Sequence, residues 1–185
     1  MKTVSCDSAG LEAVAAVLNS GGVAVIPTDT VYGLAAHPGY PEAVRRLYTI
    51  KGRDSLKPIA LLAAGAEAVE DFGIPLNPAA QKLAQEYWPG ALTMVIGSEG
   101  FRVPDHEWTR RLLVACGGCL RVTSANLSGR RAATEAPAAL AEVGLSADIV
   151  ADGGVSPGGV PSTVIRIDGS GEIEVLRQGA VKMEA

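Results

Sequence analysis

The sequence has few of the features that mark membrane, secreted or nucleic-acid-binding proteins. No apolar run in its 185 residues approaches the roughly 18 residues of a membrane span, and the N-terminus lacks the apolar core of a signal peptide. The net charge is −4 and only 4% of the residues are aromatic, which offers neither a strongly basic face nor a platform for stacking bases. We therefore expect a cytoplasmic protein that does not bind membranes and binds nucleic acid at most weakly.

Cysteine is also scarce, and the three cysteines, an odd number, do not make a disulfide framework. Cys116 and Cys119 have the spacing of a redox or zinc motif. However, Cys116 falls at the end of a predicted helix, where the helix dipole opposes thiolate formation. A zinc site would need two further ligands from Cys6, His37 and His106, none of which has paired spacing. We interpret this stretch as a glycine helix stop followed by a strand, and we expect no metal site.

The common nucleotide and hydrolase signatures are missing as well. The chain contains no G-x-x-x-x-G-K-[ST], G-x-G-x-x-G, H-E-x-x-H or G-x-S-x-G. No pair of residues stands out as a general acid and base. If the protein is an enzyme, its chemistry has to depend on another set of residues.

Hydrophobic periodicity predicts alternating strands and helices. With 48% apolar and 19% charged residues, the chain is expected to form one domain over residues 1–185, an α/β fold with an open sheet of mixed direction. Start and stop signals predict the helices at 9–20, from 41 to about 51, at 66–72, at 78–88, after a cap at Asp105, and at 137–143. The predicted strands are 23–26, 59–62, 91–96, 101–104, 120–123, 148–151, 164–167 and 172–176.

Positive charge is concentrated in one segment of this acidic chain, residues 51–58. Lys51, Arg53 and Lys57 fall within seven residues. If the segment is extended, Lys51 and Arg53 project to the same side, which suits an anionic ligand. The alternative is an ordinary solvated loop.

Two polar loops follow predicted strands, at 27–34 and 124–129. Open α/β sheets bind ligands at such strand ends, although each loop alone could be an ordinary turn. A third segment, 153–161, is rich in glycine and proline and is predicted to be a mobile flap, with a surface loop that never touches ligand as the alternative. Together with the cations, these small polar groups suit a phosphate-bearing ligand and a small zwitterion.

Seven collinear motifs resemble the YrdC/Sua5/TsaC family over nearly the whole chain. They are Pro27-Thr-Asp-Thr-Val-Tyr-Gly-Leu34, Lys51-Gly-Arg53 with Lys57-Pro58, Trp88-Pro-Gly-Ala-Leu-Thr93, Arg102-Val-Pro104, Thr123-Ser-Ala-Asn-Leu-Ser-Gly129, Pro161-Ser-Thr-Val164 and Arg177-Gln-Gly-Ala180. The resemblance implies synthesis of L-threonylcarbamoyladenylate from L-threonine, bicarbonate and ATP, with Mg²⁺ accompanying the nucleotide and pyrophosphate released. This is the first step toward N6-threonylcarbamoyladenosine at tRNA position 37.

The resemblance also implies a fold and a set of site residues. The fold is a twisted open α/β sheet with a positively charged cavity on its concave face, and the chain resembles the short form of the family. The implied residues are, for catalysis, Lys51, Arg53, Ser124 and Asn126; for ATP, Arg53, Lys57, Asn126, Thr134 and Arg177; and for threonine, Thr30, Arg102, Ser124 and Ser162.

The resemblance also implies partners, and two rival functions stand beside it. We expect transient contact with the downstream threonylcarbamoyl-transfer complex, and at most weak binding of tRNA. One rival is a carbamoyl-transfer domain like that of hydrogenase-maturation proteins. The other is a non-catalytic RNA-binding module.

Overall fold

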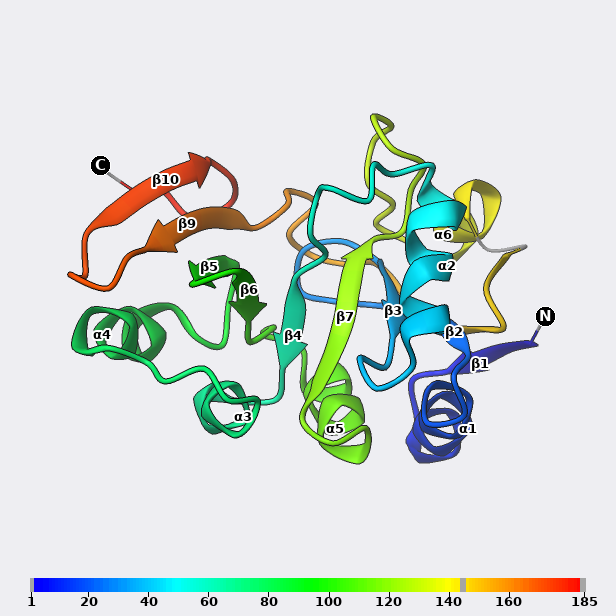
Figure 1. Cartoon of the computed structure of the whole chain (residues 1–185). Coiled ribbons are helices and arrows are strands. Elements are labelled where there is room, and N and C mark those ends of the chain that lie inside the picture. Colours follow the sequence, from blue (N-terminus) through cyan, green and yellow to red (C-terminus); the bar gives the residue numbers. More distant parts are fainter. Residues whose placement is uncertain (1, 144–145, 184–185) are drawn as a thin grey trace.

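The computed structural model describes residues 2–143 and 146–183, and these form one open mixed sheet with helices on both faces (Figure 1). The ten strands lie in the order β1-β8-β2-β3-β7-β4-β6-β5-β9-β10, with both parallel and antiparallel neighbours. The strands are β1 (Lys2–Ser5), β2 (Val23–Ile26), β3 (Gly33–Ala36), β4 (Leu61–Ala63), β5 (Leu92–Ile96), β6 (Glu99–Arg102), β7 (Cys119–Ser124), β8 (Ile149–Asp152), β9 (Thr163–Ile167) and β10 (Ile173–Arg177). The helices are α1 (Ser8–Leu18), α2 (Pro41–Lys51), α3 (Ala66–Asp71), α4 (Pro78–Tyr87), α5 (Glu107–Ala115) and α6 (Ala136–Glu142).

One half of the sheet is buried on both faces. In β2, Val23 and Val25 join the apolar cluster that contains α2 and α6, whereas Ala24 and Ile26 join the cluster that contains α1 and α5. Successive strand residues face opposite sides, so helices must cover both faces of β2. This explains why β2 is apolar at every position.

The other half of the sheet is covered on one face. Leu92 and Met94 of β5 pack with Phe101 of β6 against α3 and α4, which lie beneath this part of the sheet (Figure 1). Thr93 and Arg102, at the alternate positions, therefore point to the opposite face. That face carries the polar residues of the candidate site.

The α/β fold with a mixed open sheet is confirmed, and two strands were not predicted. β1 is a mostly exposed edge strand that pairs only with β8, so it carries little apolar signal. β3 is the short segment Gly-Leu-Ala-Ala, whose first two residues fall within the predicted 27–34 loop. It pairs antiparallel with both β2 and β7 and so joins the two halves of the sheet.

The predicted caps at the starts of α1 and α4 are confirmed, and the one predicted for α5 is not. Asp7 and Asn77 cap α1 and α4 through their side chains. The predicted cap Asp105 is wrong: His106 caps α5, its Nδ1 accepting from the Thr109 amide at 3.3 Å. The Asp105 carboxylate instead accepts a hydrogen bond from Arg110.

The segment that holds the cations is not extended at its start. Lys51 is the last residue of α2, and Gly52 follows with φ 58°, a left-handed conformation that closes a helix readily in glycine. The turn separates Lys51 from Arg53, so the two side chains do not project as neighbours from one strand. The prediction of a row along an extended segment is wrong.

The cysteine segment has the structural role expected of it. Cys116 caps the end of α5, Gly117 and Gly118 have positive φ, and β7 begins at Cys119. Burial raises the pKa of both thiols to about 11, which keeps them protonated at neutral pH.

Within residues 2–143 and 146–183, no group of three or more His, Cys, Asp or Glu side chains could hold a metal ion. In the same ranges, no helix has the length and apolarity to cross a membrane.

Candidate active site

A cavity of about 400 Å³ opens on the face of the sheet opposite α3 and α4. Its walls come from the loop after β2, the loop before β4, strands β5 to β7, the segment before β9, and strands β9 and β10. Three of its lining residues are arginines and, among the described residues that line it, none is acidic. The predicted site residues that line it are Thr30, Arg53, Arg102, Ser124, Ser162 and Arg177.

The two polar loops predicted at strand ends do meet. Gly33 of β3 pairs with Ser124 of β7, and the backbone of Tyr32 bonds to both Ala125 and Ala133 at 2.8 Å. The antiparallel pairing places the start of β3 beside the end of β7. Both loops therefore reach one end of the cavity.

Lys51 is buried beneath the 124–126 loop, and it is not among the residues that line the cavity. Its side chain is 3% exposed, and Nζ donates to the Ser124 carbonyl at 2.5 Å and the Asn126 carbonyl at 2.7 Å, with the Ser124 hydroxyl at 3.3 Å. These three acceptors match the three protons of an ammonium group. Burial and, secondarily, the charge of Arg53 lower the Lys51 pKa to about 8.

Arg53 and Arg177 bring two positive charges to the cavity. Arg53 donates to the carbonyls of Lys57 and Pro58, which fixes its guanidinium across the 53–58 loop. Arg177 donates to the Ser162 carbonyl at 2.7 Å. Partial burial lowers the Arg177 pKa, and the charge of Arg53 lowers it further. An anion bound between Arg53 and Arg177 would relieve this repulsion.

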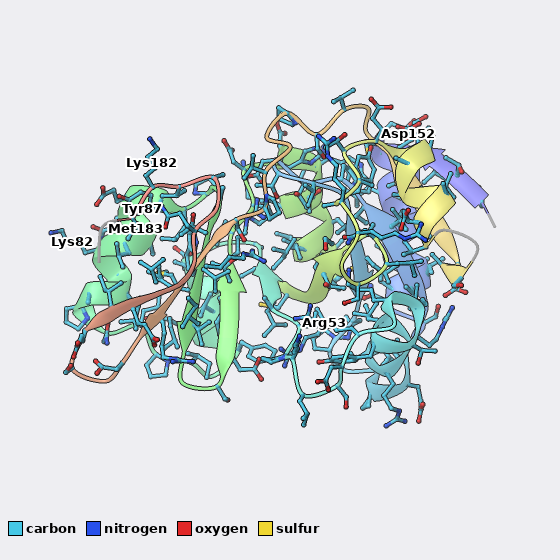
Figure 2. The ribbon with its side chains drawn as sticks, turned by 90° about the horizontal axis from the view of Figure 1, so that it is seen from above. Arg53, Lys82, Tyr87, Asp152, Lys182 and Met183 are labelled. Atoms are coloured by element: carbon cyan, nitrogen blue, oxygen red, sulfur yellow. The ribbon has the colours of Figure 1, made fainter. Side chains whose placement is uncertain are left out.

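Figure 2 shows Arg53 near the middle of the molecule, between Lys82 and Lys182 at one end and Asp152 toward the other.

Arg102 is held by partners on three sides. Nε donates to the Gly90 carbonyl at 2.9 Å, Nη1 to Thr30 Oγ1 at 2.8 Å, and Nη2 to Asp29 Oδ1 at 2.5 Å. The Arg102 side chain is 7% exposed and that of Asp29 is 13% exposed, so the ion pair is shielded from water. A guanidinium has five N–H groups, and these bonds, counted over the described residues, leave one N–H on Nη1 and one on Nη2 for a ligand.

Thr93 is a cavity residue that was not predicted. It is 6% exposed, and its hydroxyl lies 2.8 Å from the Ser162 hydroxyl across the parallel β5–β9 pair. The two hydroxyls carry two protons, and their mutual bond uses one. Thr93 lies in the motif 88–93, but the sequence alone does not reveal which residues of that motif face the cavity.

The remaining predicted residues lie outside the cavity lining. Lys57 is exposed, Thr134 is half-buried, and Asn126 is buried. Both amide protons of Asn126 are used, on the carbonyls of Leu127 and Arg130, which fixes the orientation of the amide. Asn126 Oδ1 and Ser156 Oγ are buried without a hydrogen-bond partner within the described ranges.

The glycine-rich segment 153–161 packs against the first polar loop. Gly158 and Gly159 donate their amides to the carbonyls of Asp29 (3.0 Å) and Thr30 (2.8 Å), and Ser156 donates to the Thr134 carbonyl at 2.8 Å. A Cβ at position 158 would lie 2.7 Å from the Asp29 oxygen. The segment thus lies close to the backbone of two residues whose side chains hold Arg102.

Comparisons with known proteins give a consistent family. A family model, Sua5_yciO_yrdC, described as "Telomere recombination", matches residues 16–179. The threonylcarbamoyl-AMP synthase of Bacillus subtilis is 35% identical over 92% of this chain and 53% of its own length. The crystal structure of P. abyssi Sua5 complexed with L-threonine has a TM-score of 0.86 and 28% identity, covering 96% of this chain and 57% of that one.

A structure of similar length shares the fold. E. coli YciO has a TM-score of 0.84 at 21% identity, and the match covers 96% of this chain and 94% of YciO. The chain thus spans a little over half of the Bacillus and Pyrococcus relatives and nearly all of YciO.

Proposed function

The chain belongs to the Sua5/YciO/YrdC family, and from that membership we propose that it is a threonylcarbamoyl-AMP synthase, a nucleotidyltransferase that uses L-threonine, bicarbonate and ATP. The observation that carries the proposal is the composition of one cavity. It combines the cations Arg53, Arg102 and Arg177 with the hydroxyls of Thr30 and Ser162. Guanidinium groups suit phosphates and carboxylates, and hydroxyls suit the polar groups of a small amino acid.

The first chemical step makes the nucleophile. The neutral amine of threonine attacks the carbon of bicarbonate, a C–N bond forms, water leaves, and N-carboxythreonine remains. One oxygen of its new carboxylate then attacks the α-phosphorus of ATP. The bond from that phosphorus to the bridging oxygen breaks, and pyrophosphate leaves with its electron pair and the Mg²⁺ that entered with ATP.

The chief barrier is the meeting of two anions. Fixed positive groups lower it because they are already oriented before charge develops in the transition state. We assign Arg53, Lys57, Asn126, Thr134 and Arg177 to the nucleotide and its phosphates, and Thr30, Arg102, Ser124 and Ser162 to threonine. Lys51 contributes indirectly: its ammonium group lies beneath the 124–126 loop and fixes two carbonyls and one hydroxyl of that loop. No acid–base pair is required of the protein.

The product is a labile mixed anhydride, so a downstream threonylcarbamoyl-transfer complex has to receive it quickly. We propose that contact with this complex is transient and that tRNA binds to this chain at most weakly. We propose that the single domain of residues 1–185 catalyses the first step.

A pyrophosphate-release assay tests the proposal. We expect release from ATP only when threonine and bicarbonate are both present, and threonylcarbamoyl-AMP as the product by mass spectrometry. Release without threonine would contradict the proposal. Turnover of carbamoyl phosphate in place of bicarbonate would favour the carbamoyl-transfer alternative, and binding of RNA with no pyrophosphate release would favour the RNA-binding one.

A further inference from the structure

Glu99 and Arg121 form an ion pair on the face of the sheet opposite the cavity. Arg121 donates from Nη1 and Nη2 to the two carboxylate oxygens of Glu99, at 2.5 and 2.8 Å, and the two side chains are largely shielded from water. Gly100 and Val122, their neighbours in the chain, line the cavity. Successive strand residues face opposite sides, so Glu99 and Arg121 project away from the cavity. A ligand in the cavity therefore has no direct contact with the pair.

The ion pair crosses the chain segment that leads into β4. In the sheet, β4 lies between β6, which carries Glu99, and β7, which carries Arg121. Arg121 Nη1 also donates to the Ile59 carbonyl at 2.8 Å. A carboxylate that accepts two parallel N–H groups fixes the plane of the guanidinium. Glu99 thus orients the group that bonds to Ile59 and neutralises its charge.

Three consecutive carbonyls of this segment accept from two guanidinium groups. Ile59 accepts from Arg121, whereas Lys57 and Pro58 accept from Arg53, at 3.1 Å from Nε and 3.2 Å from Nη2. Arg121 and Arg53 therefore hold adjacent peptide groups, the first from behind the sheet and the second at the cavity.

The segment is anchored to the rest of the protein at Ile59. Residues 54–58 are exposed, and the amides of Leu56 and Lys57 bond to Asp54 within the same loop. The Ile59 side chain is buried and its carbonyl is bonded to Arg121. A fixed side chain and a fixed carbonyl restrict the backbone of Ile59, and the preceding peptide group carries the Pro58 carbonyl.

The orientation of the Arg53 guanidinium depends on these carbonyls. A guanidinium has five N–H groups, and the bonds to Lys57 and Pro58, counted over the described residues, leave two on Nη1 and one on Nη2. Arg53 lines the cavity. Displacement of the two carbonyls would turn the remaining three donors with them.

We propose that the Glu99–Arg121 ion pair is a positioning device for Arg53. It acts through Ile59 and the Pro58 carbonyl, and it holds the Arg53 guanidinium in the orientation that meets the phosphates of the nucleotide. The phosphate contact rests on the proposed function, whereas the mechanical link does not. Glu99 and Arg121 are thus positioning residues and not catalytic ones.

NMR of the free protein tests the mechanical link without any substrate. With ¹⁵N-labelled arginine, the Nε–H signal of Arg53 is identified by its loss in Arg53→Ala. Arg121→Met should speed the exchange of this proton with solvent about tenfold, because the Lys57 carbonyl that accepts it is no longer held in place. Arg166→Met is the matched control, since it removes an exposed ion pair with Glu174 between two other strands. Unchanged exchange in a folded Arg121→Met would overturn the inference.

A second variant covers the case in which Arg121→Met does not fold. That substitution leaves the shielded Glu99 carboxylate without its partner, which is destabilising. Glu99→Met combined with Arg121→Met removes both charges and should restore thermal stability. It lacks the same bond to Ile59, so the Arg53 Nε–H should again exchange about tenfold faster. Slow exchange in this double variant would also overturn the inference.

A double-mutant cycle on pyrophosphate release tests the link to the nucleotide. The Glu99→Met/Arg121→Met change should lower kcat/KM for ATP about tenfold and leave L-threonine affinity unchanged. In the Arg53→Ala background the same change should cost less than about twofold, because its effect passes through Arg53. An equal loss in both backgrounds would indicate a general structural role and overturn the inference. If the unsubstituted protein releases no pyrophosphate, the proposed function fails, and the NMR experiment still decides the mechanical link.

Discussion

Lys51 is a buried ammonium group whose pKa, lowered to about 8 by burial and by Arg53, lies near neutrality. An anionic ligand favours its charged form, so nucleotide binding should take up protons wherever free Lys51 is partly neutral. We therefore expect the affinity for a non-hydrolysable ATP analogue to fall as the pH rises from 7 to 9. The three cysteine thiols do not titrate there, since their pKa values are raised to about 11 or 12.

Calorimetry in buffers of different ionisation enthalpy measures this proton uptake directly on the unsubstituted protein. Lys51→Met serves as the control and should show affinity that changes little between pH 7 and 9. A flat pH dependence of the unsubstituted protein, without proton uptake, would mean that the charge of Lys51 does not act on the nucleotide.

Arg53 is the lining cation whose removal should affect turnover most directly. Arg53→Ala, and likewise Lys51→Ala, should lower pyrophosphate release by about 10²-fold or more, because preorganised charge at the transition state is lost. Within the part of the chain that the structure describes, the side chain of Arg53 bonds to two carbonyls of an exposed loop and to no other group, so its variant should remain folded. Arg45→Ala, which removes an exposed cation paired with Glu42, is the matched control. Near-normal turnover in a folded Arg53→Ala or Lys51→Ala would reject the assignment of that residue.

At the scale of elements, segment 153–161 is the part whose position should depend on ligand. Its amides at Gly158 and Gly159 bond to the carbonyls of Asp29 and Thr30, the residues that hold Arg102. Ligand at Arg102 should therefore favour the docked segment. Hydrogen exchange across 153–161 should slow when threonine and an ATP analogue are added. Unchanged protection at saturating ligand would make the segment a surface loop with no part in binding.

A single methyl group should displace this segment. Gly158→Ala would place Cβ 2.7 Å from the Asp29 oxygen, against backbone that cannot swing away. We expect faster exchange in 153–161 and threonine affinity reduced about tenfold or more, with thermal stability only slightly lowered. Gly169→Ala is the matched control, since nothing lies within 4 Å of its added Cβ and its φ is not positive. Equal behaviour of the two variants would contradict a role for the docked segment.

At the scale of the whole molecule, the continuous sheet predicts one cooperative unit. The two tryptophans report on different parts of it: Trp108 packs with α1 and α5, whereas Trp88 packs with α4 under β5 and β6. In the variants Trp88→Phe and Trp108→Phe, fluorescence of the remaining tryptophan should follow denaturant unfolding with the same midpoint as circular dichroism of that same variant. Transitions that separate within one variant would show two folding units and contradict the single domain.

The sequence by itself determined the class of fold and most of its elements. Periodicity and local signals such as Asp7 and the Asn77-Pro78 pair act within a few residues, so they can be interpreted without tertiary contacts. The collinear motifs likewise led to the family and to six residues that line the cavity. The hydrophobic pattern did not predict two strands. The edge strand β1 is mostly exposed and so has few apolar residues, and β3 consists mainly of small residues.

Only the tertiary structure decided what each polar residue can do. The glycine that ends α2 separates Lys51 from Arg53, and the 124–126 loop then covers the ammonium group. Asp29 and Thr93 have partners more than sixty residues away, which no local pattern encodes. The partners of Arg102, which come from the loop after β2 and from Gly90, meet only in the folded chain. Residue type fixes the number of donors and acceptors, but the fold determines which of them remain free for a ligand.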